Sequence, residues 1–226
     1  GTRNVTRKYM KNNRHKVFIL ETADPFEFLK DVNEGVAIEQ ICKNLGHWSK
    51  RIQIFNKDDF RKAIDYISSI DPEKGNNEPI VIHLSMHGNE SGIAIGPDFI
   101  EWKELSSMVI KSYSNLRSYL GKIIYIISSC GANNQELTKC LQSELCTTKK
   151  GFIPPEYVFT YDSESINWKD SMIGWTVLYR MALEIDYDNK STVMNALNKI
   201  AKIDIGKIKY HRWDGKSKSY KHFTGK

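Results

Sequence analysis

Residues 80–88 read IVIHLSMHG, and residues 123–131 read IIYIISSCG. Each stretch begins with an apolar run and ends in a histidine or a cysteine that is followed directly by glycine. Strands that are buried on both faces of a parallel sheet are apolar throughout, whereas half-exposed strands alternate. The runs Ile80–Leu84 and Lys122–Ile127 therefore predict two central strands of a parallel sheet.

The remaining segments alternate between the patterns of strands and helices. Apolar residues spaced by three and four, with acidic residues in the first turn, favour helices, and short apolar or alternating runs favour strands. The further expected strands are Lys16–Leu20, Arg51–Phe55 and Tyr157–Tyr161, and the expected helices are Gly35–Leu45, Asp58–Ile70, Glu101–Leu120, Gln135–Cys146, Asp170–Ile185 and Ser191–Ile203. Strands separated by helices of this length predict an α/β fold, a three-layer αβα sandwich with a mostly parallel central sheet.

A chain of 226 residues suits one large domain with its own core. We expect this domain at residues 16–226, after a basic N-terminal tail at residues 1–15. Near its end, Ile208–Trp213 and Ser217–Phe223 flank the dipeptide Asp214-Gly215, which is a signal for a two-residue turn. Residues 208–223 therefore predict a terminal β-hairpin.

Charge and composition narrow the class of protein. The net charge is +6, and basic residues gather at both ends of the chain, as in solvated tails or in surfaces that bind nucleic acid or an acidic partner. No apolar run reaches the roughly 18–20 residues that span a bilayer, and no secretory signal opens the sequence, so we expect no membrane association. Four cysteines without C-x-x-C spacing are typical of free thiols in a reducing compartment, here the cytoplasm.

The carboxyl ends of the two central strands hold the residues that could carry chemistry. Ligands of open parallel sheets bind beyond these ends, and here they hold His87 and Cys130. A thiol nucleophile needs a partner that takes and returns a proton, and histidine does so near neutral pH. We expect His87 and Cys130 to be catalytic, with the backbone N–H groups of Gly88 and Cys130 facing an oxyanion. A helix starting near Asn133 would favour the thiolate.

The sequence does not predict a metal or a nucleotide cofactor. His83 and His87 have H-x-x-x-H spacing, but on a strand their Cα atoms lie about 13 Å apart, too far for one zinc ion. We interpret His83 as a core histidine. No glycine-rich phosphate-binding motif follows any strand. The other cysteines lie in helix patterns and are interpreted as packing residues, and the other histidines, in polar or terminal stretches, carry no functional signal; these residues are Cys42, Cys140, Cys146, His15, His47, His211 and His222.

Three segments together resemble a known family. Residues 80–95 (IVIHLSMHGNESGIAI) resemble the strand, His-Gly and hairpin segment of caspase-like cysteine peptidases, and residues 122–134 (KIIYIISSCGANN) resemble their strand and Cys-Gly segment. Residues 157–175 (YVFTYDSESINWKDSMIGW) are similar to the caspase strand and loop that carry a Trp, a basic residue and a Ser before Gly-aromatic. The His-x-x-x-His-Gly form is closest to the CHAT branch, which has the separases among its relatives, and points to a prokaryotic member.

The resemblance covers roughly Lys16–Ile185 and implies a caspase-like sandwich with endopeptidase activity. In it Cys130 is the nucleophile, His87 protonates the leaving amine, and the N–H groups of Gly88 and Cys130 form the oxyanion hole. The chain departs from caspases in one respect, because it reads Ser-Ser-Cys-Gly-Ala at 128–132 where caspases carry Gln-Ala-Cys-Arg-Gly. The resemblance therefore does not imply cleavage after Asp.

The expected substrate pocket has candidates of both charges. Lys169 follows Trp168 where caspases place a pocket Arg, which favours an acidic substrate residue. Asp162 resembles the acid that follows an aromatic residue in separase-like relatives. Asp24, Trp168 and Asp170 are further candidates. A carboxylate there would pair with Arg or Lys, so we expect a basic residue before the cleaved bond. The alternative is that Asp162 and Asp170 only cap the next helix.

The family resemblance also implies how such a peptidase is used. We expect a protein or peptide substrate, no cofactor, and control by a regulatory protein partner or sensor in a defence or cell-death pathway. Residues 147–151 (TTKKG) are a candidate processing loop. Two alternatives from other classes are a catalytically silent binding or scaffold module and a basic protein that binds nucleic acid through its termini.

Overall fold

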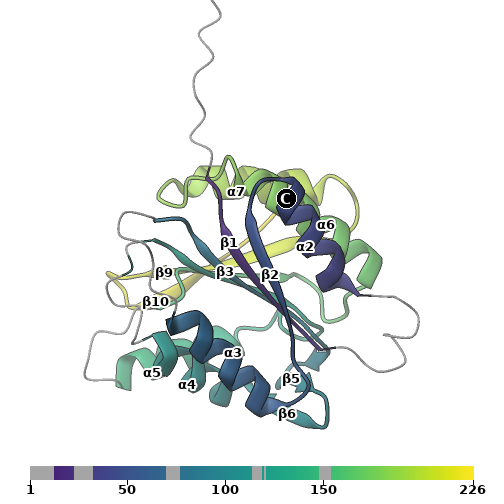
Figure 1. Cartoon of the computed structure of the whole chain (residues 1–226). Helices are drawn as coiled ribbons and strands as arrows, with labels where there is room; N and C mark the ends of the chain where they lie inside the picture. The colour runs from purple at the N-terminus through teal and green to yellow at the C-terminus, as the bar shows by residue number, and fades with distance from the viewer. Residues whose placement is uncertain (1–12, 23–32, 70–76, 114–118, 120, 148–153) are drawn as a thin grey trace, which may run out of the picture.

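The central feature of the computed structural model is one seven-stranded sheet (Figure 1). The structure describes residues 13–22, 33–69, 77–113, 119, 121–147 and 154–226. The strand order is β10-β9-β8-β7-β3-β1-β2. The strands are β1 (Lys16–Glu21), β2 (Trp48–Gln53), β3 (Ile80–Ser85), β7 (Ile123–Ser128), β8 (Tyr157–Tyr161), β9 (Ile208–Asp214) and β10 (Ser219–Thr224). The five from β8 to β2 run parallel, and β9 and β10 add an antiparallel hairpin, so the expected mostly parallel sheet and terminal hairpin are confirmed.

Six helices in the described part of the chain cover both faces of this sheet. They are α2 (Glu34–Asn44), α3 (Lys57–Ser69), α4 (Trp102–Tyr113), α5 (Glu136–Thr147), α6 (Trp168–Ala182) and α7 (Lys190–Ala201). Figure 1 shows α3, α4 and α5 on one face and α2, α6 and α7 on the other. The chain is therefore an α/β protein whose layers are compatible with a three-layer sandwich.

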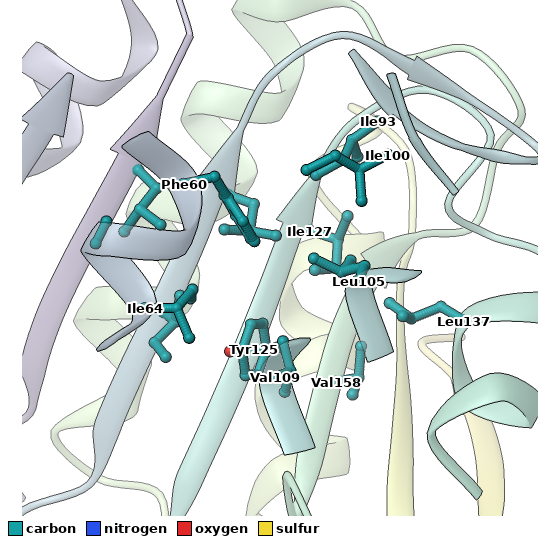
Figure 2. Close-up of a cluster of buried hydrophobic side chains, with 14 of the residues drawn as sticks. Phe60, Ile64, Ile93, Ile100, Leu105, Val109, Tyr125, Ile127, Leu137 and Val158 are labelled. Carbon is teal, nitrogen blue, oxygen red and sulfur yellow. The ribbon is translucent and has the colours of Figure 1, made fainter. Parts of the chain in front are cut away.

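Each buried strand supplies both interiors, because successive side chains point to opposite faces. In β7, Tyr125 and Ile127 pack beneath α3–α5, whereas Ile124 and Ile126 pack beneath α2, α6 and α7. Figure 2 shows the first interior, where Phe60 and other side chains of the covering helices meet the strands. This arrangement explains why the central strands read as continuous apolar runs.

Some boundaries differ from the sequence-based expectation. The second strand begins at Trp48 rather than Arg51, because its parallel pairing with β1 starts at Lys16 opposite Trp48. The helix α6 begins at Trp168 because the Asn167 side chain accepts a hydrogen bond from the Lys169 N–H at 3.0 Å. Asn167 is thus its N-cap, and neither Asp162 nor Asp170 caps it.

Three histidines without a signal in the sequence are in fact buried, namely His15, His47 and His211. His15 bonds to the Asn13 carbonyl and the Tyr187 hydroxyl, both at 2.7 Å. Histidines in polar or terminal stretches look exposed in the sequence, but tertiary packing covers these three. The packing roles expected for Cys42 and Cys140 agree with the structure, since Cys42 is buried in one interior and Cys140 packs against the other. The side chain of Cys146 lies outside the described residues.

A small second sheet follows β3. It consists of β4 (Gly88–Asn89), β5 (Gly92–Ile95) and β6 (Asp98–Glu101), paired antiparallel in that order.

Among the described residues, none of the helices has both the length and the apolar character needed to cross a membrane. Asp24 and residues 148–151 of the candidate processing loop lie outside the described residues.

Candidate active site

His87 and Cys130 lie at the same edge of the sheet. The strands β3 and β7 pair in register with Ser85 opposite Ser128, and the two residues follow just beyond this pair. Both line one pocket of about 270 Å³ that opens to solvent. Its other lining residues are Glu34, Met86, Ser128, Ser129, Ile166, Trp168 and Ser171. The structure therefore brings together the two residues that the sequence placed at strand ends.

Two glycines let the loops that carry these residues meet backbone to backbone. Gly131 has a φ of +73°, and a Cβ atom there would lie 2.2 Å from the carbonyl carbon of Asn89. A Cβ on Gly88 would lie 2.2 Å from the Ser129 hydroxyl oxygen and 3.3 Å from the carbonyl oxygen of Cys130. Side chains at either position would push the loops apart. The glycines after His87 and Cys130 are thus needed for close approach of the loops.

The thiol of Cys130 is half-buried and held by the segment before α6. The Ile166 N–H donates to its Sγ at 3.5 Å, and the Gly131 N–H donates to the carbonyl oxygen of Glu164 at 2.9 Å. These bonds fix residues 164–166 across Cys130. The expected helix start near Asn133 is wrong, because α5 begins only at Glu136.

Trp168 forms a wall of the pocket beside His87. The two rings meet edge to face, with centroids 6.2 Å apart and planes at 75°. Trp168 is the first residue of α6, so the Asn167 cap also fixes the position of Trp168 at the start of this helix. The expectation that Trp168 contributes to the pocket agrees with its place in the lining.

The charged candidates from the same segment do not line this pocket. Asp162 is paired with Lys209, with Oδ1 and Nζ 3.3 Å apart. Lys169 is exposed, and Asp170 is half-buried in the first turn of α6. Neither appears among the residues around Cys130. The Asp162 side chain is therefore turned toward β9, and the Lys169 side chain toward solvent.

A buried carboxylate that the sequence analysis missed does line the pocket. Glu34, the first residue of α2, is only 3% exposed. Its Oε1 lies 2.9 Å from His83 Nε2, and its Oε2 accepts a hydrogen bond from the Ser128 hydroxyl, also at 2.9 Å. In the sequence Glu34 is simply an acid in a first turn, which ordinarily faces solvent. Only the tertiary contacts turn it inward.

All hydrogen bonds of this network run toward Glu34. The Trp175 indole N–H donates to the Ser128 hydroxyl at 2.9 Å, which in turn donates to Glu34. The Tyr179 hydroxyl is 2.9 Å from His83 Nδ1, and burial raises the pKa of Tyr179 well above its usual value. Tyr179 and Glu34 thus contact the two ring nitrogens of His83, and Glu34 also accepts from the Ser128 hydroxyl. The carboxyl group of Glu34 is therefore the point where the two chains of hydrogen bonds meet.

A second buried acidic residue lies close to Glu34. Glu21 accepts the Gly35 N–H at 3.0 Å and pairs with Arg51 at 3.3 Å. Burial raises the pKa of Glu21, and the neighbouring Glu34 adds to this effect. Two acidic side chains and one guanidinium group thus lie close together on the Glu34 side of the pocket.

Comparisons with known proteins do not identify a family for this chain. No family model matches the chain, and no curated protein sequence matches it either. Among the described residues, no group of three or more His, Cys, Asp or Glu side chains is arranged to hold a metal ion. The family resemblance of the motifs therefore remains a prediction, to be weighed with the geometry of the pocket.

Proposed function

We propose that the chain is a caspase-like cysteine endopeptidase, closest to the CHAT and separase-like branch, with Cys130 and His87 as its catalytic pair. The observation that carries this proposal is the shared pocket, in which a histidine and a half-buried cysteine from in-register strand ends lie together. A thiol and an imidazole at one solvent-open pocket are the minimum for acyl transfer through a thioester. The layered α/β fold with a mostly parallel sheet is compatible with this family.

The proposed reaction follows from the roles of these groups. His87 takes the thiol proton while Cys130 Sγ bonds to the carbonyl carbon of the scissile peptide. The carbonyl electron pair moves to oxygen, where the N–H groups of Gly88 and Cys130 stabilise it. The tetrahedral intermediate then expels the amine, which takes its proton from His87 and leaves a thioester. Water, deprotonated by His87, attacks the thioester, and Cys130 leaves as the thiolate, which takes the proton back from His87, so that the enzyme is restored.

Two features of the described structure support this sequence of steps. The Ile166 N–H that donates to Cys130 Sγ would hold the sulfur in place, and such bonds are stronger when the acceptor is charged. The close approach of Gly88 to the Cys130 backbone puts the two proposed oxyanion donors on adjoining loops.

The substrate residue that enters the pocket is proposed to be basic. The support comes from Glu34 rather than from the aspartates suggested by the sequence, since Glu34 is the acidic residue of the pocket lining. Arginine or lysine would meet a complementary potential, whereas aspartate would meet a repulsive one. A cytoplasmic location and a regulatory partner in a defence or cell-death pathway complete the proposal, on the basis of the resemblance alone.

Active-site labelling tests the catalytic pair. Acyloxymethylketone peptides carrying Arg, Lys, Asp or Leu next to the reactive group are incubated with the protein, and mass spectrometry locates the adduct. We expect an adduct on Cys130 that disappears in His87→Ala, with peptide cleavage falling roughly 10³-fold or more in Cys130→Ala. The matched control is Cys140→Ala, since this other half-buried thiol does not line the pocket. Undiminished cleavage by Cys130→Ala, or equal labelling of Cys140, would contradict the proposal.

Peptide selectivity tests the basic preference separately. Fluorogenic peptides that differ only in Arg, norleucine or Asp before the cleaved bond should rank in that order. Glu34→Gln keeps the size of the side chain and removes its charge, so the preference for Arg over norleucine should shrink about tenfold. Cleavage only after Asp, or a preference that Glu34→Gln leaves unchanged, would refute this part of the proposal while leaving the catalytic pair intact.

A further inference from the structure

One lysine of the terminal hairpin reaches both loops that form the candidate active site. Lys209 lies in β9, and its side chain is only 18% exposed. Its Nζ donates to the Asn133 carbonyl oxygen at 3.2 Å and lies 3.3 Å from Asp162 Oδ1. An ammonium group has three donors, so one lysine can hold both acceptors at once.

The two acceptors belong to the two segments whose separation determines the pocket. Asn133 lies in the connection between β7 and α5, shortly after Cys130, and Asp162 begins the connection between β8 and α6 that contains Ile166. The residue just before β9 adds a further tie, because the Asp162 N–H donates to the Lys207 carbonyl oxygen at 2.8 Å. A hairpin that is distant in the sequence thus holds both sides of the Cys130 thiol.

These contacts also explain the pairing of Asp162. Since its carboxylate is turned toward β9, it lies outside the pocket lining and acts as an anchor for its loop. The Gly131 N–H bond to Glu164 and the Ile166 N–H bond to Cys130 Sγ both require that loop to stay close to Cys130. Loss of the lysine side chain would leave the loop tied to the hairpin side by backbone bonds such as the one from the Asp162 N–H to Lys207.

We propose that Lys209 is a positioning residue that holds the Cys130 loop and the Asp162–Ile166 segment together. Through it, the terminal hairpin sets where the Ile166 N–H meets the Cys130 sulfur. The consequence for catalysis rests on the proposed function, whereas the positioning itself can be measured on the thiol and on the backbone without any peptidase activity.

The test compares Lys209→Met with Lys221→Met as a matched control on the same hairpin, where Lys221 is exposed. Hydrogen exchange followed by mass spectrometry reports on the peptide at residues 162–168, and the rate of iodoacetamide alkylation reports on the Cys130 thiol. We expect exchange in that peptide to speed up about tenfold in Lys209→Met, with a changed alkylation rate, because a charge-assisted hydrogen bond is lost. Lys221→Met should match the unmodified protein in both measurements.

Further variants separate positioning from a general loss of structure. Lys209→Arg keeps the charge and two or more donors, so it should restore most of the exchange protection. Asp162→Asn should reproduce part of the effect of Lys209→Met, and the double variant should add little. If peptides are cleaved, kcat should fall about tenfold in Lys209→Met while KM changes less. Exchange and alkylation rates in Lys209→Met that equal those of the unmodified protein would overturn the proposal, whether or not any peptide is cleaved.

Discussion

Beneath α3, α4 and α5 the central sheet meets mainly aliphatic and aromatic side chains, whereas beneath α2 and α6 the same strands meet a hydrogen-bonded polar network. The strand β3 illustrates the difference, because Ile82 and Leu84 face the first interior and His83, between them, faces Glu34 and Tyr179 in the second. One strand therefore serves two purposes. Its apolar side stabilises the fold, and its polar side holds a carboxylate beneath the candidate pocket.

The physical reason for this division lies in the cost of burying polar groups. A buried carboxylate without partners is strongly destabilising, and a network is tolerable only if its members are satisfied. Glu34 meets this condition through His83 and Ser128, which are themselves hydrogen-bonded to Tyr179 and Trp175. We infer that the apolar face supplies the stability that allows the opposite face to keep a buried acidic residue near Cys130.

The largest expected effect is on the apolar face. Phe60 of α3 is fully buried against β-strand residues, so Phe60→Ala should lower the free energy of unfolding by about 3 to 5 kcal/mol. Urea denaturation measures the loss. Tyr66→Ala, in the same helix but 59% exposed, is the control and should change the free energy by less than about 0.5 kcal/mol. Equal losses in both variants would mean that this interior is not the main source of stability.

A second effect concerns pH and the polar groups around α6. Burial, more than the neighbouring His47, lowers the pKa of His15 to about 3, whereas in the unfolded chain it titrates near its ordinary value of 6.5. The unfolded state thus binds the proton first, and stability from this group is complete above pH 6.5 and declines as the pH falls toward 3. We expect a loss of about 2 kcal/mol between pH 7 and pH 5.

Urea titrations at several pH values measure this loss. His15→Gln should flatten the dependence, while His47 and His211, whose pKa values burial also lowers, retain a part of it. Identical slopes for the variant and the unmodified protein would show that His15 is accessible to protons in the folded state. His15 would then no longer count among the buried polar groups that make the stability depend on pH.

The smallest effect separates satisfied from unsatisfied hydroxyl groups in the second interior. Tyr179→Phe removes the donor to His83 and should cost about 1 to 2 kcal/mol. Tyr210 is equally buried there, but its hydroxyl has no hydrogen-bond partner within the described residues, so Tyr210→Phe should be neutral or slightly stabilising. Thermal unfolding of the matched pair measures the difference. A reversed order would show that the network does not stabilise the protein.

Local sequence patterns were sufficient to predict much of the central sheet. The runs Ile80–Leu84 and Lys122–Ile127 predicted buried parallel strands, and the positions of His87 and Cys130 just after them predicted which edge would hold a site. These inferences succeed because period, burial and strand direction act within a few neighbouring residues. The helix start near Asn133 failed, since glycine and turn geometry at 131–135 delay α5 to Glu136.

The sequence by itself determined the alternation of strands and helices, the terminal hairpin and the placement of a thiol and an imidazole at two strand ends. Tertiary structure alone decided that Glu34 lines the pocket, that Ile166 meets the Cys130 sulfur and that Asp162 turns to Lys209. The reason is separation along the chain, since Ser128 and Glu34 are 94 residues apart. Contacts at such a distance depend on how the layers pack, and neither hydrophobic period nor local propensity specifies that packing.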